Sequence, residues 1–310
     1  MRIVFMGTPE FAVPTLNALA DAGHEIAVVV TQPDRPKGRG RKLTPSPVKV
    51  RAEELGLAVY QPVKIRQQEA VEELAKARPE IMVVAAFGQI LPKSVLDIPP
   101  RGCLNVHASL LPKYRGAAPV NWAIINGEEL TGVTIMRMDV GLDTGDMLLK
   151  EETRIAADDT TGSLLARLSG IGGRLVVKAI ADIEAGRIVP VKQDDSASTY
   201  APMLKKEMGL IDWTKPARET ERLVRGLDPW PGAYTTKEGE TVRVWGAHVY
   251  GHEGYDGAPG EVVDVNRTGI KVMTGDGVLV ITEVQAGGGR RMTVSDFLSG
   301  HKILKGKRLT

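Results

Sequence analysis

The sequence predicts an α/β protein in two parts: a doubly wound, mostly parallel sheet, followed by a small antiparallel β domain. Apolar, β-branched runs without alternating polarity fill the first part, and such strands are buried on both faces, as parallel strands flanked by helices are. Beyond about residue 240, short alternating segments separated by Gly, Asp and Asn are typical of a small barrel or sandwich.

The elements of the first part follow in order. The run at 2–6 (RIVFM) ends at Gly7, a stretch at 11–20 carries apolar residues at helical spacing, and the run at 26–30 (IAVVV) is a second strand. Further apolar runs predict strands at 58–60, 81–86, 103–107 and 133–138. Helical patterns recur at 66–77, 163–168 and 175–185.

A polar stretch with few apolar residues, KQDDSAS at 192–198, separates the two parts. We therefore expect a first domain at 1–189, a linker at 190–207 and a second domain at 208–310.

Composition excludes several classes of protein. The single cysteine, Cys103, excludes a disulfide scaffold and favours a reduced, cytoplasmic setting. No apolar run reaches the length of about 18 residues that a membrane span needs, and the N-terminus lacks the sections of a secretory signal. With 40 basic and 38 acidic side chains, the net charge of +2 is too small to attract polyanions globally, so a nucleic-acid site must be a local patch.

One basic patch lies between Asp34 and Arg51, where seven basic side chains accompany a single acidic one. Five of the seven are interleaved with proline and glycine and cannot form a stable helix, so we expect a loop that is mobile until it meets phosphate. A loop that only solubilises the surface is the alternative. The five residues are Arg35, Lys37, Arg39, Arg41 and Lys42.

Two kinds of cofactor are disfavoured. The turn after the first strand has one glycine and a proline where a dinucleotide-binding fold has G-x-G-x-x-G, and no G-x-x-x-x-G-K-[ST] string occurs, so bound NAD or ATP is not expected. Five histidines and one cysteine show no spacing typical of metal ligands, so no bound metal is expected either.

Residues that could carry chemistry gather between 101 and 149. Asn105 and His107 lie two apart on a predicted strand and face the same side, where an amide and an imidazole can grip one oxygen or one proton together. Asp143 follows the strand at 133–138 in a glycine-rich turn, and ligands sit beyond the carboxyl ends of strands in open α/β sheets. We expect Asp143 to orient His107 in an acyl-transfer or proton-transfer site.

Plainer interpretations remain open on the residues alone. Asn105 and His107 could each be a turn former or a satisfied polar residue, and Asp143 could simply stabilise its own turn.

Longer strings carry a resemblance to a known family. The chain resembles the folate-dependent formyltransferases in N-x-H-x-S-L-L-P at 105–112, R-G-A-A-P at 115–119, T-G-V-T at 131–134 and G-L-D-T-G at 141–145. It is similar to the members that act on aminoacylated transfer RNA in FMGTPEFA at 5–12, the basic loop at 31–49 and DPWPGA at 228–233. The similarity runs from end to end, and no catalytic motif departs from the pattern.

The resemblance implies that a formyl group passes from 10-formyltetrahydrofolate, a co-substrate, to the α-amino group of methionyl initiator transfer RNA. Asn105 and His107 would donate hydrogen bonds to the formyl oxygen as charge develops, and Asp143 would hold His107 and, with water, help to move the amine proton. No covalent intermediate is needed, so Cys103 is expected to be a buried apolar residue. A monomer is expected.

The resemblance also implies a folate pocket in which Ile90 and Leu91 pack against the pterin faces. The alternative is that these two side chains belong to the core. The implied folate-binding residues are Phe87, Gly88, Gln89, Ile90, Leu91, Ser109, Leu110, Leu111, Pro112, Asp139, Val140, Gly141 and Leu142. The five residues of the basic loop would bind the acceptor end of the transfer RNA, with Arg41 wedged into the end of the stem.

For the second domain the resemblance implies an OB-like barrel along the acceptor stem. Trp213, Trp230 and Trp245 could stack bases there, although packing inside the protein is the favoured role. Three alternatives remain: a glycinamide ribonucleotide or sugar-nucleotide formyltransferase, a noncatalytic RNA-binding protein, and a nicotinamide dehydrogenase. The glycinamide ribonucleotide enzyme usually ends after one α/β domain, intact Asn105, His107 and Asp143 count against the noncatalytic protein, and the dehydrogenase interpretation lacks its glycine fingerprint.

Overall fold

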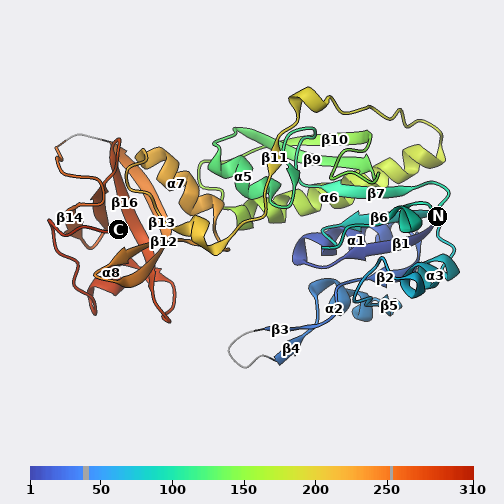
Figure 1. The fold of residues 1–310 in the computed structure, drawn as a ribbon, viewed down its shortest axis with the longest axis horizontal. Coiled ribbons are helices and arrows are strands. Elements are labelled where there is room, and N and C mark those ends of the chain that lie inside the picture. The colour runs from blue at the N-terminus through green and yellow to red at the C-terminus, as the bar shows by residue number, and fades with distance from the viewer. Residues whose placement is uncertain (38–41, 252–253) are drawn as a thin grey trace. The chain divides into compact units, whose positions relative to one another are not determined.

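The computed structural model describes residues 1–37, 42–251 and 254–310. The chain divides into two compact units, each built from more than one stretch of sequence (Figure 1). The first unit comprises Met1–Pro119, Leu130–Arg154 and Leu165–Ala201. The second comprises Val120–Glu129, Ile155–Leu164 and Pro202–Thr310.

Seven strands form the sheet of the first unit, in the order β10-β9-β7-β6-β1-β2-β5. Antiparallel β9 (Leu130–Arg137) and β10 (Met147–Arg154) extend one side of it. The other strands are parallel, so the predicted mostly parallel sheet is confirmed. They are β7 (Cys103–His107), β6 (Ile81–Ala85), β1 (Arg2–Gly7), β2 (Glu25–Val30) and β5 (Val59–Tyr60).

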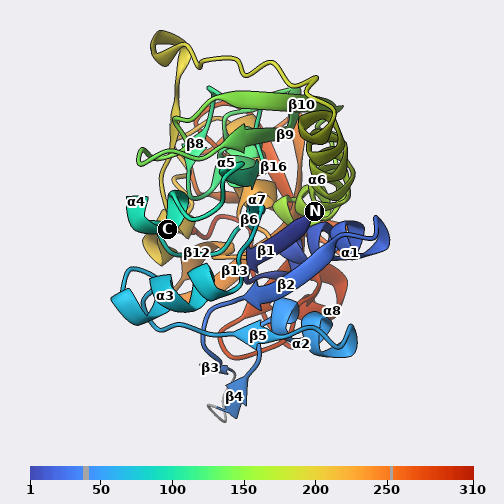
Figure 2. The ribbon, with the colours of Figure 1, turned by 90° about the vertical axis from the view of Figure 1, so that its right-hand side faces the viewer.

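Helices cover both faces of this sheet (Figure 2). On one face α3 (Gln68–Lys76) and α4 (Lys93–Leu96) pack over the strands, burying Leu74 and Val95 with Met82 and Cys103. The other face carries η1 (Glu10–Ala12), α1 (Val13–Asp21), α2 (Pro47–Glu54) and α6 (Thr161–Glu184).

Helix α6 is continuous where the sequence suggested two helical segments. Its glycines explain the difference, because they let the helix backbone approach its neighbours closely. A Cβ on Gly172 would lie 2.6 Å from the side chain of Val106, and one on Gly173 would lie 2.8 Å from the carbonyl oxygen of Pro14.

The described ends of the basic loop form an antiparallel pair, β3 (Arg35–Lys37) with β4 (Lys42–Thr44), instead of the irregular chain that we expected. Residues next to the hairpin tie it down. Asp34 accepts hydrogen bonds from Lys49 and Gln61, both at 2.7 Å. These bonds, that of Lys49 first, lower the pKa of the Asp34 carboxyl.

The expected linker at 190–207 is tied closely to the first unit. Strand β11 (Tyr200–Ala201) pairs in parallel with β8 (Arg115–Gly116), and the hydroxyl of Thr199 accepts a hydrogen bond of 2.8 Å from the amide of Tyr114. Short helical turns at η2 (Asp195–Ala197) and η3 (Lys206–Gly209) lie on either side of β11 in sequence.

The second unit is an antiparallel sheet in the order β12-β13-β16-β15-β14, with β17 paired to β16. Its core contains Val244, Ile270 and Leu279 from the strands and Val224 and Phe297 from the helices. The strands are β12 (Ala233–Lys237), β13 (Glu240–Gly251), β14 (Val262–Asn266), β15 (Gly269–Met273), β16 (Val278–Ala286) and β17 (Met292–Thr293). The helices are α5 (Pro119–Ile125, in this unit from Val120), α7 (Ala217–Gly226) and α8 (Val294–Leu298).

The OB-like barrel is not confirmed, because no pairing between the edge strands β12 and β14 closes the sheet within the described residues. The C-terminal segment instead bonds to both edges. The amide of Val262 donates to the carbonyl of Lys307, and the amide of Thr310 donates to the carbonyl of Thr236, at 2.8 and 3.0 Å.

The three tryptophans of this unit differ in exposure. Trp213 is buried and donates a hydrogen bond to Thr235. Trp245 is half-buried beneath Arg291, whose guanidinium lies 5.4 Å from the ring centroid. Trp230 is 52% exposed, so packing inside the protein accounts for the first two residues and not for the third.

Candidate active site

Strand β7 holds Asn105 and His107 on one face of the first unit's sheet, and Asp143 reaches both. The amide nitrogen of Asn105 lies 3.3 Å from Asp143 Oδ1, and His107 Nδ1 lies 3.6 Å from Asp143 Oδ2. The side chains of His107 and Asp143 are 6% and 14% exposed, so water screens this pair weakly. The structure therefore brings together the three residues that the sequence singled out.

The chain brings Asp143 to the site by a different path from the one expected. Strand β9 runs antiparallel to β7, with Arg137 opposite Leu104 at the start of β7, so the carboxyl ends of these two strands lie at opposite ends of the pair. The chain after Met138 folds back over the sheet to carry Asp143 to Asn105 and His107.

The hydrogen bonds of His107 define how its ring is oriented. Its Nε2 lies 2.9 Å from the carbonyl oxygen of Tyr114. Because a carbonyl oxygen only accepts, Nε2 carries a hydrogen, and Nδ1 faces the Asp143 carboxylate. At 3.6 Å, the distance from Nδ1 to Asp143 is too long for a hydrogen bond, so a hydrogen on Nδ1 can also be donated to a substrate oxygen.

Several groups hold Asp143, which has a left-handed backbone with φ of 53°. The amide of Gly116 donates to Asp143 Oδ2 at 2.9 Å. The side chain of Gln193 donates to the carbonyls of Asp143 and Gly145, both at 2.8 Å, and in turn accepts from Arg115 at 2.9 Å. A strained residue with this many fixed contacts is pre-organised for a role at the site.

Sequence reasoning did not identify Tyr114, Gly116 or Gln193 as parts of this site. Tyr114 and Gly116 act through backbone groups, which leave no side-chain signature. Gln193 comes from the stretch interpreted as a linker, so only the folded chain shows its contact with the Asp143 loop.

Chemically, the arrangement combines an amide, an imidazole and a carboxylate. Asn105 uses one amide hydrogen toward Asp143, and its second can be donated to an oxygen that gains negative charge. The carboxylate of Asp143 faces Nδ1 of His107 at 3.6 Å. Such a set can stabilise a tetrahedral oxyanion and handle the proton that leaves an attacking amine.

Cys103 is buried in the apolar core, although it lies two residues from Asn105 in sequence. Burial, and to a lesser degree the charge of Asp97, raise the pKa of its thiol to about 12. The thiol is therefore protonated at neutral pH, as expected for an apolar core residue and not for a nucleophile.

In the loop after β6, the first group of expected folate residues divides into exposed and buried side chains. Ile90 is 84% exposed, whereas Phe87 and Leu91 are buried in the core under α3 and α4. The carbonyl of Phe87 already accepts from Thr8 and Gln32. Ile90 is thus the one large apolar side chain of this loop that is available to a ligand.

Gln89 of the same loop is a structural residue, since its side chain accepts a hydrogen bond of 2.8 Å from the amide of Ile65 and donates to the carbonyl of Pro62. Gly88, with a φ of 86°, gives the loop a turn that other residues rarely adopt.

The other expected folate residues follow β7 and β9. Ser109 and Leu111 are buried, and Ser109 donates to the carbonyl of Lys113 at 2.7 Å, while Leu110 and Pro112 are half-buried. Asp139 forms the turn before Asp143 by accepting from the amide of Gly141 and the hydroxyl of Thr144, at 3.0 and 2.7 Å. The large apolar residues on this turn, Val140 and Leu142, are 72% and 51% exposed.

The basic loop is described in part. Arg35 is exposed and donates a hydrogen bond of 3.3 Å to Gln32. Lys37 and Lys42 are paired in register across the hairpin, whereas Arg39 and Arg41 lie outside the described residues.

No group of three or more His, Cys, Asp or Glu side chains in residues 1–37, 42–251 and 254–310 could hold a metal ion. No helix in the same ranges is long and apolar enough to cross a membrane.

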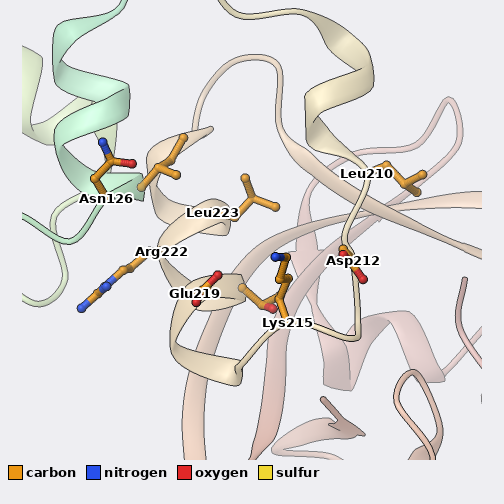
Figure 3. Close-up of a pocket in the computed structure, with 9 residues that line it drawn as sticks. Asn126, Leu210, Asp212, Lys215, Glu219, Arg222 and Leu223 are labelled. Carbon is orange, nitrogen blue, oxygen red and sulfur yellow. The ribbon is translucent and has the colours of Figure 1, made fainter. Parts of the chain in front are cut away.

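The second unit has a pocket of about 370 Å³ beside α7 (Figure 3). Lys215 and Arg222 line it together with Asp212 and Glu219, so its charges balance and favour neither an anion nor a cation. None of the residues that the sequence singled out as a site lines this pocket.

The open α/β sheet, with an amide, an imidazole and a carboxylate meeting beside β7, has the groups that the transfer of an acyl-type group requires. Two family models match the chain, "Formyl transferase" over residues 1–180 and "Formyl transferase, C-terminal domain" over residues 203–302. The chain therefore belongs to the formyl transferase family, which confirms the family resemblance.

Full-length relatives agree with this assignment. The chain is 55% identical over 306 residues to a methionyl-tRNA formyltransferase of Citrifermentans bemidjiense, covering 99% of this chain and 95% of that protein. It is 53% identical over 309 residues to one of Geotalea uraniireducens, covering 100% and 98%. The fold is also similar to that of an N-formyltransferase from Helicobacter canadensis, with a TM-score of 0.67 at 19% identity, covering 91% of this chain and 98% of that one.

Proposed function

We propose that this protein transfers the formyl group of 10-formyltetrahydrofolate to the α-amino group of methionyl initiator transfer RNA. The observation that carries the proposal is the contact of Asp143 with both Asn105 and His107, in a chain whose relatives are methionyl-tRNA formyltransferases over their full length. This similarity favours the transfer RNA substrate over glycinamide ribonucleotide or a sugar nucleotide.

In the proposed reaction the methionyl amine attacks the formyl carbon, and the C–N bond to the folate breaks after a tetrahedral intermediate. Asn105 Nδ2 and a hydrogen on His107 Nδ1 stabilise the oxyanion. Nδ1 fits this role better than Nε2, because Nε2 is held by the carbonyl of Tyr114. The amine proton leaves through water toward the Asp143 carboxylate, and the folate nitrogen receives a proton as it departs.

For the folate, the exposed apolar side chains of Ile90, Val140 and Leu142 are the proposed contacts with the pterin and its neighbouring ring. The remaining candidates shape these loops. Phe87, Leu91, Ser109 and Leu111 are buried, and Gln89 and Asp139 hold the turns through hydrogen bonds.

For the transfer RNA, the basic loop at 35–42 supplies the proposed contacts, with Arg35, Lys37, Arg39, Arg41 and Lys42 meeting phosphates and Arg41 wedged into the end of the acceptor stem. The second unit, as an OB-like surface whose C-terminal segment carries Lys302, Lys305, Lys307 and Arg308, lies along that stem. We propose that the protein acts as a cytoplasmic monomer.

The decisive assay incubates the protein with 10-formyltetrahydrofolate and either methionyl initiator or methionyl elongator transfer RNA. We expect the initiator to be formylated and the elongator to react far more slowly. Glycinamide ribonucleotide and a nucleotide-linked amino sugar serve as competing acceptors. Formylation of either one in preference to methionyl initiator transfer RNA would overturn the proposal.

A further inference from the structure

Tyr200 is an aromatic residue that has no part in the proposed reaction. It lies on β11 and is 61% exposed, although its strand is paired with β8 beside the candidate active site. Its ring covers Gly116, because a Cβ at that glycine would lie 2.7 Å from Cε2 and 3.1 Å from Cδ2 of Tyr200. Gly116 has a φ of 112°, so the close approach depends on glycine.

The same glycine connects Tyr200 to the reacting groups. The amide of Gly116 donates to Asp143 Oδ2 at 2.9 Å, and Asp143 faces His107 and Asn105. Gly116 therefore lies between the ring of Tyr200 and the carboxylate of Asp143. Most of the surface of Tyr200 is open to solvent.

The backbone on both sides of Tyr200 is fixed. The amide of Arg115 donates to the carbonyl of Thr199, and the amide of Ala117 donates to the carbonyl of Ala201, both at 2.9 Å. Gln193, earlier in the same segment, bonds to the carbonyl of Asp143. An aromatic side chain on a backbone held in this way loses little conformational entropy when a ligand packs on it.

We propose that Tyr200 positions the acceptor substrate by stacking with the base of its 3′-terminal nucleotide. This inference rests on the proposed function, since the aminoacyl group of a charged transfer RNA is carried by that terminal nucleoside. With the amino group at Asn105, His107 and Asp143, the terminal base must lie close to the site, because only the ester and the ribose join it to the aminoacyl group, and Tyr200 offers an exposed planar ring there. Stacking on exposed aromatic side chains is the usual way in which proteins hold unpaired bases.

The methionine side chain is a less suitable occupant of this surface. An apolar side chain is recognised in an enclosed pocket that removes it from water, and Tyr200, a residue that is 61% exposed, does not enclose one. A planar base, in contrast, needs only one planar face.

The test compares three substitutions with a matched control in formylation of methionyl initiator transfer RNA. Tyr200→Phe keeps the ring, Tyr200→Leu keeps an apolar cover over Gly116 without an aromatic face, and Tyr200→Ala removes both. Val189→Ala is the control, because Val189 is an exposed apolar residue, 75% exposed, earlier in the same segment.

We expect Tyr200→Phe and Val189→Ala to keep the KM for transfer RNA within about twofold, and Tyr200→Leu and Tyr200→Ala to raise it by about 5- to 100-fold. The kcat of Tyr200→Leu at saturating transfer RNA should fall much less than its KM rises, because stacking contributes to binding and not to the chemical step. The KM for 10-formyltetrahydrofolate should not change.

A second readout follows the base directly. An RNA hairpin of the acceptor stem that ends in 2-aminopurine should lose fluorescence on binding the wild-type protein or Tyr200→Phe, and should keep it with Tyr200→Leu and Tyr200→Ala.

The outcomes separate the two proposals. If wild-type protein formylates no methionyl transfer RNA, the proposed function fails, whatever Tyr200 does. If wild type is active but Tyr200→Leu and Tyr200→Ala keep the KM for transfer RNA and quench 2-aminopurine as wild type does, the stacking proposal is wrong. It is equally wrong if both variants lose kcat with an unchanged KM, since Tyr200 would then act only by supporting Gly116 and Asp143.

Discussion

Asp143 is the residue on which the candidate site depends most, because it contacts Asn105, faces His107 and accepts the amide of Gly116. We expect Asp143→Asn to lower kcat at least about 100-fold and Asn105→Ala to lower it about 100- to 1,000-fold, through loss of charge stabilisation in the transition state.

Asp146→Asn, the same change on the same loop, is the matched control and should stay near wild type. Circular dichroism and thermal melting check that each variant is folded. Near-normal turnover of Asp143→Asn at saturating substrates would remove Asp143 from the site.

Alkylation of Cys103 tests whether the side chain of this residue is buried. With the pKa of its thiol raised from 9.0 to about 12, iodoacetamide at pH 8 should leave the folded protein unmodified and alkylate it once it is unfolded.

The raised pKa of Cys103 also predicts how the free energy of unfolding depends on pH. Between pH 9 and 12 the unfolded thiol ionises while the folded one stays protonated, so this group's contribution is intact below pH 9 and is lost as pH rises toward 12. The free energy of unfolding of wild type relative to Cys103→Ala should fall by about 1.4 kcal/mol per pH unit in that window. A constant difference across the window, measured by urea unfolding, would contradict the burial argument.

At the scale of elements, the pairing of β8 with β11 should depend on Gly116. A Cβ there would lie 2.8 Å from the carbonyl of Ala201 and would also strain a φ of 112°. We expect Gly116→Ala to reduce kcat at least about tenfold, because the amide that holds Asp143 would move.

Gly186→Ala separates this effect from backbone strain alone. Gly186 also has a positive φ, of 68°, but no atom lies within 4 Å of an added Cβ. It should cost about 1 kcal/mol of stability and leave turnover unchanged. Equal kinetic effects of the two substitutions would show that the position of Gly116 is not special.

The hairpin formed by β3 and β4 is the second element with a testable role. Neutralising Arg35, Lys37, Arg39 or Lys42 to Gln should weaken transfer RNA binding and lower the salt slope by about one per lost phosphate contact. Arg41→Gln should weaken binding of the initiator transfer RNA by more than the loss of one charge explains, because the opened end of the stem would lose its support. Lys76→Gln, at an exposed lysine of α3, is the control. Normal formylation by all five of these variants at physiological salt would assign recognition to the second unit.

At the scale of the whole molecule, the two units do not correspond to two halves of the chain. Val120–Glu129 and Ile155–Leu164 belong to the second unit, where Asn121 donates to the carbonyl of Gly226 and Trp122 to that of Pro202, at 2.8 and 2.9 Å. Cutting the chain at residue 201 would leave these stretches without their partners.

We therefore expect a protein of residues 1–201 to bind the dye ANS and to melt at a lower temperature than the full chain, and to have no formylation activity. Calorimetry and dye fluorescence of the two proteins decide this. A fragment that melts at the same temperature without dye binding would mean that the first 201 residues fold independently.

The sequence by itself determined the strands that are apolar on both faces and the residue types of the site. Strand β7 matches its predicted bounds, and β1, β2 and β6 match theirs to within one residue, because continuous Val, Ile and Leu runs leave few alternatives to burial. Asn105, His107 and Asp143 were identified from local spacing and from family strings, since side chains at those positions carry the chemistry.

Only the tertiary structure decided what depends on distant segments meeting. Strand β10 is an edge strand whose exposed residues, such as Glu152, are polar, so no apolar run marked it. The antiparallel pairing of β9, the return of Asp143 across the sheet, and the holding of that residue by Gly116 and Gln193 all join groups far apart in sequence. Backbone amides and long-range hydrogen bonds leave no local pattern in the sequence. Tyr200 lies beside Gly116 only because β11 pairs with β8, and for that physical reason it became a candidate contact only in the folded chain.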